Sequence, residues 1–164
     1  MITIRSYEDK DWPKVWAIIE PVFRDGSTYA FSPEITENET KKIWIEAPQA
    51  TYVCDDENRN IIGTYYIKPN QPALGAHVCN CGYIVDEKAR GQGVASTMCK
   101  HSQEEALKLG FKAMQYNLVV STNEGAIRLW KKHDFRVIGV LPKAFNHKIN
   151  GFVDALVMYK QLET

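Results

Sequence analysis

The chain has 164 residues, 45% of them hydrophobic, and it carries 20 basic and 20 acidic side chains, so its formal net charge is zero. A chain of this length can bury a sizeable core as one domain, residues 1–164, without disulfides or metals. Balanced charge argues against a nucleic-acid-binding or membrane-surface protein, whose footprint is basic. The sequence shows no secretory leader and no apolar run that could span a bilayer, so we expect a cytoplasmic protein with a small ligand.

The first part of the chain predicts one strand followed by two helices. Residues 2–5 read as a strand, and Asp11 is expected to cap a helix that has Pro13 in its first turn. A polar and aromatic connection at residues 24–31 leads to a shorter helix over about residues 36–46. The amphipathic spacing of the first helix indicates that it packs on a sheet.

The rest of the chain predicts strands interrupted by two helices. In chain order these are strands at 51–54, 61–67 and 75–85, a helix at 94–109, a strand at 111–120, a helix ending near residue 133, and strands at 135–141 and 152–159, joined through residues 146–151. The order βααβββαβαββ predicts an α/β (α+β) sandwich. Its sheet should be mixed and mostly antiparallel, with six or seven strands and about four helices.

A glycine-rich loop lies between the strand that ends at Val85 and the helix that follows it, and its residues are Arg90, Gly91, Gln92, Gly93, Val94 and Ala95. The first N–H groups of a helix have no intrahelical partner, and the helix dipole adds partial positive charge there. Glycines let the backbone come close to a ligand. The loop therefore predicts a phosphate site, with Arg90 and Lys88 adding formal charge.

The spacing of the glycines narrows the choice of phosphate ligand. A Walker loop needs a lysine before Ser or Thr, and the dinucleotide fingerprint needs a third glycine where Ser96 stands. The remaining R-x-x-G-x-A pattern, Arg90 with Gly93 and Ala95, resembles the acetyl-CoA signature of the GNAT acetyltransferase superfamily. The later run from Ser121 through Asn123 to Asp134 and Phe135 also fits that family. A ligand-free strand-to-helix turn is the structural alternative.

The resemblance implies the GNAT fold, with splayed fourth and fifth strands, and acetyl-CoA as cosubstrate without a metal. The residues implied to bind acetyl-CoA are Tyr83, Val85, Arg90, Gly91, Gln92, Gly93, Val94, Ala95, Ser96, Asn123 and Trp130. Extra charge near the adenosine phosphate would come from Lys100, Lys131 and Lys132, whose alternative role is plain solvated surface. Asn123 can also serve as an ordinary helix cap. Since GNAT proteins often dimerise, a homodimer through the last strands is a further expectation.

Acetyl transfer needs a polarised carbonyl and a proton for the leaving thiolate. The resemblance assigns the first task to a main-chain N–H near Val85. Trp130 stands where the family usually has a tyrosine acid, and an indole N–H is not a usable acid near neutral pH. The leaving thiolate would then be protonated by water or by another tyrosine such as Tyr29, or it would need no dedicated acid.

A closer resemblance concerns the acceptor. Three runs, at residues 63–70, 77–83 and 117–123, look like the GNAT branch that contains a yeast acetyltransferase of proline analogues such as azetidine-2-carboxylate. Two asparagines of that branch match Asn80 and Asn117. An amide oxygen can accept a hydrogen bond from the acceptor amine and aim its lone pair. The structural alternative is that both amides bond neighbouring backbone.

Cysteine chemistry offers two minor hypotheses. His77, Cys79 and Cys81 alternate along a strand, where same-face residues stand about 7 Å apart, too far to share one ion without a bulge. A covalent route through Cys79 or Cys81 lacks an adjacent base. All four cysteines are expected to be buried and reduced.

The sequence thus predicts an acetyl-CoA-dependent N-acetyltransferase. Its acceptor would be a small-molecule amine, an amino acid or an analogue, which attacks directly in a ternary complex. Two alternatives stay open. Trp130 favours a non-catalytic acyl-CoA sensor, and a peptide or protein N-acetyltransferase would need an open groove.

Overall fold

The computed structural model describes residues 1–162, and within them one sheet runs in the order β1-β2-β3-β4-β5-β7-β6. The strands are β1 (Thr3–Ser6), β2 (Ala50–Asp55), β3 (Ile61–Pro69), β4 (Val78–Val85), β5 (Ala113–Val120), β6 (Arg136–His147) and β7 (Gly151–Gln161). The α-helices are α1 (Trp12–Asp25), α2 (Glu37–Lys41), α3 (Val94–Lys108) and α4 (Glu124–Lys132). Among the described strands, only β4 and β5 pair in parallel, and the other neighbours are antiparallel. The predicted element order and sandwich are confirmed.

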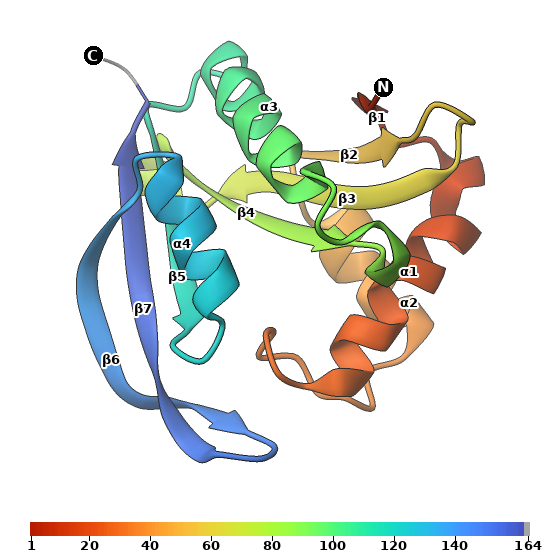
Figure 1. The fold of residues 1–164 in the computed structure, drawn as a ribbon. Coiled ribbons are helices and arrows are strands. Elements are labelled where there is room, and N and C mark those ends of the chain that lie inside the picture. Colours follow the sequence, from red (N-terminus) through yellow and green to blue (C-terminus); the bar gives the residue numbers. More distant parts are fainter. Residues whose placement is uncertain (163–164) are drawn as a thin grey trace.

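Helices cover both faces of the sheet, α3 and α4 on one and α1 and α2 on the other (Figure 1). Each face has its own hydrophobic cluster. The cluster under α3 contains the fully buried Met98 and Met114. The cluster under α1 contains the fully buried Val15 and Trp44. No helix within residues 1–162 has both the length and the apolar character that a membrane crossing requires.

The start of α1 differs from the prediction in one respect. Asp11 occupies the N-cap position, but its carboxylate accepts no hydrogen bond from α1. It accepts hydrogen bonds from Arg5 at 2.8 and 3.0 Å and from the Glu8 N–H at 2.8 Å. Arg5 also donates to Asp55 at 2.8 Å. The Arg5 guanidinium lowers the pKa of the Asp11 carboxyl, and this cluster ties β1, β2 and the start of α1 together.

Two strand boundaries differ from the prediction by three residues or more. The strand expected at 75–85 begins at Val78, because residues 73–75 form a 3₁₀ turn. The strand expected at 135–141 continues to His147, and the connection to β7 shrinks to residues 148–150. The pairing of β6 with β7 has two register shifts and continues beyond each of them, as it does at β-bulges. The sequence of this segment resembles a turn, so the continuation of the strand was not predicted.

The edge strand β6 carries exposed apolar side chains. Val137, Ile138, Val140 and Leu141 are 37 to 58% exposed, and Phe152 on β7 is 68% exposed. An apolar edge of this kind is a surface that another strand or another copy can cover. The expected homodimer stays a prediction.

Gly82 in β4 makes room for the aromatic ring of its register partner on β3, Tyr66. A Cβ built on Gly82 would lie 2.5 Å from a Tyr66 ring carbon. The ring cannot easily withdraw, because it packs edge-on against Trp44 with centroids 4.8 Å apart. Tyr66 and Trp44 are 5% and 0% exposed.

We expect Gly82→Ala to lower the free energy of unfolding by about 1–3 kcal/mol, since overpacking at a rigid ring forces side chains and backbone to shift. Gly139→Ala in β6 is the matched control, because a Cβ there meets no atom within 4 Å. Urea unfolding measures both variants. Equal midpoints and slopes would show that the Tyr66 ring yields without cost.

Candidate active site

The strands β4 and β5 pair over a very short stretch. The register joins only Val78 with Ala113 and Cys79 with Met114. Immediately beyond, Asn80 Nδ2 donates to the Gln115 carbonyl at 2.9 Å and bridges the two strands through a side chain. No further β4–β5 pair follows within the described residues. The facing edges of the two strands are therefore open to a ligand.

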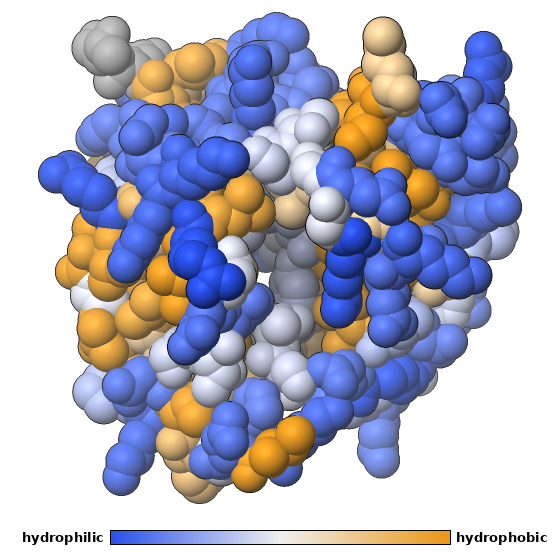
Figure 2. Space-filling view, viewed as in Figure 1, coloured by the Kyte–Doolittle hydropathy of each residue, from blue (hydrophilic) through white to orange (hydrophobic). Residues whose placement is uncertain are grey.

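A cavity of about 630 Å³ occupies this wedge. In the space-filling view it corresponds to a hollow near the centre of the face, between α4 and α1 (Figure 2). Ten predicted site residues line it: Tyr29, Asn80, Tyr83, Val85, Arg90, Gly91, Ala95, Asn117, Asn123 and Trp130. The structure thus brings together groups that the sequence predicted from separate patterns.

The glycine-rich loop has the geometry of an anion cradle. Gly91 and Gly93 adopt left-handed backbone angles, with φ of 78° and 80°. A Cβ at either position would meet no protein atom within 4 Å, so the space beside the loop is free. The helix α3 starts directly afterwards, and its first backbone bond is Thr97 N–H to Gly93 O at 3.0 Å. The N–H groups of residues 94–96 are therefore left for a ligand.

Four predicted residues of this loop and helix lie outside the cavity lining. Val94 is 2% exposed and its side chain belongs to the core under α3, so only its backbone can serve a ligand. Ser96 Oγ lies 2.8 Å from His133 Nε2 and links α3 to the end of α4. Gln92 and Gly93 are exposed and do not line the cavity.

Positive charge surrounds this end of the cavity. Arg90 lines the cavity and its guanidinium makes no ion pair or side-chain hydrogen bond with residues 1–162. The side chains of Lys88, Lys100, Lys131 and Lys132 are exposed on the same loop and on α3 and α4. An anion bound at the start of α3 would lie closest to Arg90. The four lysines do not line the cavity and stay candidates for contacts to more distant phosphate groups.

The helix α4 forms another wall of the cavity. Asn123 caps it, with Oδ1 accepting the Ala126 N–H at 3.3 Å. Asn123 can therefore serve both as the helix cap and as a contact to a ligand, since it also lines the cavity. Trp130 packs on Tyr83 and Tyr116, with ring centroids 5.1 and 4.8 Å apart.

Beneath Trp130 lies a buried hydroxyl cluster. Tyr83 Oη is 2.6 Å from Ser102 Oγ and 2.9 Å from Tyr116 Oη. Burial raises the pKa of both tyrosines well above the ordinary value, so they stay protonated. The Tyr83 hydroxyl is therefore occupied by its contacts to α3 and β5. Only the backbone of Tyr83 faces the open edge of β4.

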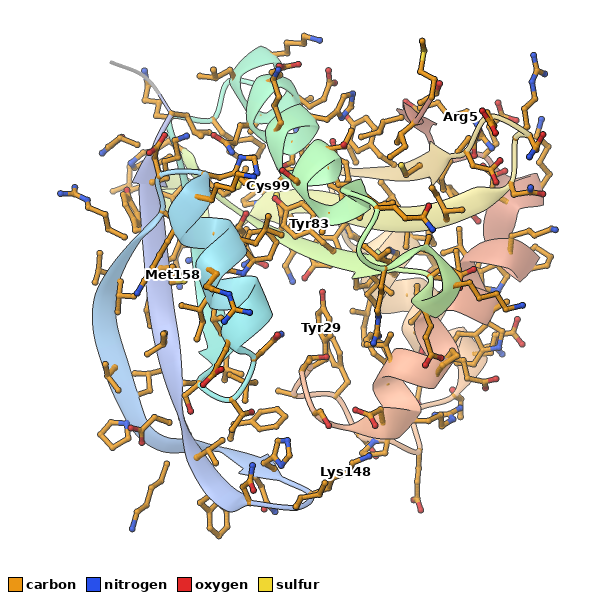
Figure 3. The ribbon with its side chains drawn as sticks, viewed as in Figure 1. Arg5, Tyr29, Tyr83, Cys99, Lys148 and Met158 are labelled. Carbon is orange, nitrogen blue, oxygen red and sulfur yellow. The ribbon has the colours of Figure 1, made fainter. Side chains whose placement is uncertain are left out.

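Tyr29 reaches into the wedge from the loop after α1 (Figure 3). Its hydroxyl donates to the Tyr83 carbonyl at 2.9 Å. The ring packs against Phe31 and Trp44, with centroids 6.2 and 6.0 Å apart. Burial raises the pKa of Tyr29 well above its ordinary value, so the hydroxyl keeps its proton at neutral and alkaline pH.

Four residues with side-chain amides are linked by hydrogen bonds on the α1 face of the wedge, and we call them the amide cluster: Asn70, Asn80, Gln115 and Asn117. Gln115 Nε2 donates to Asn117 Oδ1 at 3.0 Å, and Asn117 Nδ2 donates to Asn70 Oδ1 at 2.6 Å. Asn80 joins them through the main-chain carbonyl of Gln115. The predicted asparagines thus combine structural bonds with places in the cavity lining.

Sequence reasoning missed several lining residues, among them Tyr66, Tyr116, Phe31 and Leu129. Alternation along β5 offered a signal for one of them. Because neighbouring strand residues point to opposite faces, Tyr116 lies on the face opposite Asn117, in the cluster under α3. The remaining residues come from contacts between distant segments.

The cysteine hypotheses gain no geometric support. Cys79 and Cys81 are buried free thiols, whereas His77 is exposed. Within the described residues no group of three His, Cys, Asp or Glu side chains is placed to hold a metal ion. Burial raises the pKa of the Cys81 thiol well above its ordinary value, which disfavours the thiolate that a covalent route needs.

Comparison with known proteins identifies the family. Residues 12–135 match the model of the acetyltransferase (GNAT) family. The chain belongs to this family and is an acyltransferase of the N-acetyltransferase class. The predicted family, fold class and enzyme class are confirmed.

Relatives agree in sequence and in fold. The N-acetyltransferase aca1 of Schizosaccharomyces pombe is 30% identical over 148 residues, which cover 80% of this chain and 71% of that protein. A GCN5-related N-acetyltransferase structure from Kribbella flavida is 37% identical, with a TM-score of 0.93, over 98% of this chain and 97% of that one. The structure of yncA from Salmonella typhimurium, solved with acetyl-CoA, has a TM-score of 0.87 at 20% identity, over 100% of this chain and 95% of that one.

We expect Gly93→Ala to destabilise the fold by about 1–2 kcal/mol, because an L side chain is strained at this left-handed position. Gly125→Ala in α4 is the control: its φ is not positive and a Cβ there meets no atom within 4 Å. That substitution should be neutral or stabilising, since alanine favours helix. Thermal and urea unfolding compare them. Equal stability of both variants would show that the cradle tolerates a side chain.

Proposed function

We propose that this chain transfers the acetyl group of acetyl-CoA to the amine of a small molecule in one ternary complex. The observation that carries the proposal is the wedge between β4 and β5. One end of the wedge meets the cradle at α3, and the other lies under the loop after α1. Two substrates that enter from opposite ends would meet inside the sheet, without a covalent enzyme intermediate.

The residues present fit acetyl-CoA chemically. The pyrophosphate suits the unpaired N–H groups at the start of α3 together with Arg90. The amide-bearing pantetheine arm suits the unpaired edge of β4, where a peptide-like chain can bond as a strand would. Asn123 and Trp130 would border the arm from α4. The presence of acetyl-CoA in the Salmonella typhimurium structure supports this assignment.

Direct transfer forms a bond between the acceptor nitrogen and the acetyl carbon and breaks the carbon–sulfur bond. The amine proton passes to water, and the thiolate takes up a proton. The Val85 N–H is our candidate to polarise the carbonyl. Backbone groups of alternate strand residues point to the same edge, so Val85 faces the open side as Tyr83 does.

Tyr29 is the group we assign to the leaving thiolate. Trp130 stands in the position that usually holds a tyrosine, and its ring is packed into the wall of the cavity. The Tyr29 hydroxyl lies in the cavity, keeps its proton, and is held on the Tyr83 carbonyl at the open edge of β4. To protonate a thiolate near this edge, the hydroxyl would release the Tyr83 carbonyl, donate its one proton to sulfur and regain a proton from water.

Asn80 and Asn117 are our candidates to orient the acceptor. One N–H of Asn80 is used by Gln115, while its Oδ1 has only a long contact with the Tyr66 hydroxyl at 3.5 Å. That oxygen is free to accept a hydrogen bond from an amine. Asn117 is exposed within the cavity, and its amide is oriented by Asn70 and Gln115.

We favour a small acceptor over a peptide, because the loop residues Thr28, Tyr29, Ala30 and Phe31 line the acceptor side of the cavity. The likeness to the proline-analogue branch of the family supports an amino acid or a related compound. The test is thiol release from acetyl-CoA with amino acids, proline analogues, polyamines, aminoglycosides and short peptides. Release with amino acids or analogues is expected. Release with peptides alone, or acetyl-CoA binding without any turnover, would contradict the proposal and favour the protein-acetylating or sensor alternative.

We expect Tyr29→Phe to reduce kcat by about 10²-fold or more while the KM for acetyl-CoA changes little, because general acids contribute about this much. Tyr7→Phe is the matched control. The Tyr7 hydroxyl is buried and has no hydrogen-bond partner among residues 1–162, so its removal should leave turnover unchanged. Steady-state kinetics measures both. Wild-type kcat in Tyr29→Phe would remove this hydroxyl from the reaction.

A further inference from the structure

The cavity lining is poor in charge, and this limits the acceptor. Arg90 at the cradle is the one lining residue with a formally charged side chain within residues 1–162. The lining holds no Asp, Glu or His side chain. Nothing there can pair with a cationic acceptor, and no carboxylate or imidazole can take the proton of an ammonium. An acceptor must be recognised by other means and must arrive with a neutral nitrogen.

A second cation stands beside the acceptor end. Lys68 in β3 is directly opposite Asn80 in the β3–β4 register, so the two side chains share the α1 face of the sheet. Its Nζ lies 5.3 Å from the ring centroid of Tyr66, which lines the cavity. Lys68 is partly buried, and it makes no ion pair with a carboxylate in residues 1–162.

The groups around Lys68 are suited to an anion. The neighbouring amide cluster supplies N–H donors and no negative charge, and Asn80 and Asn117 bring it to the cavity wall. An unpaired ammonium next to amide donors favours a carboxylate and repels a polycation. A nearby positive charge also favours the neutral form of an acceptor amine, which the absence of a base requires.

We propose that Lys68 reads a carboxylate on the acceptor, so that the substrates of this chain are amines that carry an acid group, as α-amino acids do. The proposal rests on the proposed function and deepens it. Lys68 would determine acceptor specificity by binding the carboxylate next to Asn80, and it would take no part in proton transfer. Polyamines and aminoglycosides would be poor acceptors for the same reason.

The test compares matched pairs of acceptors: glycine, alanine, proline and azetidine-2-carboxylate, each with its carboxamide. For the wild type, kcat/KM should be at least about tenfold higher for the acids, as a charge-assisted contact provides. Lys68→Met should abolish this preference by lowering the values for the acids alone. Lys68→Arg should restore part of it, and Lys14→Met on the exposed side of α1 should change nothing.

Three outcomes would overturn the proposal: a wild-type preference for carboxamides or polycations, equal losses on both series in Lys68→Met, or no loss at all. Calorimetric binding of the same acids in the presence of coenzyme A separates this result from the proposed reaction. If no amine releases thiol, acetyl transfer to small amines fails, while weaker binding of acids to Lys68→Met than to wild type still supports carboxylate recognition. Equal binding to both would reject it.

Discussion

The separation of β4 and β5 is the constraint on which the rest of the structure depends. Two register pairs hold the strands together, and the Asn80 side chain supplies one more bridge before they diverge. Buried backbone groups without hydrogen-bond partners lower the stability of the fold. A ligand in this wedge would supply such partners. The Tyr29 hydroxyl meets one of these groups, the Tyr83 carbonyl. The remaining open edge is where we propose that the cosubstrate binds.

Much of the fold could be predicted because its signals are local. The apolar spacing of α1 and the strand-to-helix turn at Gly91 and Gly93 depend on residues close in sequence. Element order followed from these signals, and the cradle followed from the glycines. Errors arose where local signals were ambiguous, at Asp11 and along β6.

The parts that could not be predicted depend on contacts between distant segments. The bond of Tyr29 to β4 joins residues 54 positions apart, and the Asn117 bond to Asn70 joins residues 47 apart. The position of Lys68 opposite Asn80 follows from strand register, which no short motif encodes. Sequence reasoning named Asn80 and Asn117 from a family likeness. It had no means of finding the cation that stands beside them.

The narrow seam between β4 and β5 also couples occupancy to the persistence of the protein. The strands β1 to β4 and β5 to β7 form two half-sheets, and the main-chain pairing between them in the described residues is confined to that seam. A ligand in the wedge touches both halves and binds the folded chain alone, so it stabilises the fold in proportion to the logarithm of its concentration. At a low concentration of that ligand, the chain would open more often along the seam and would be degraded sooner than the ligand-bound protein. The supply of cosubstrate would then set the amount of enzyme as well as its rate.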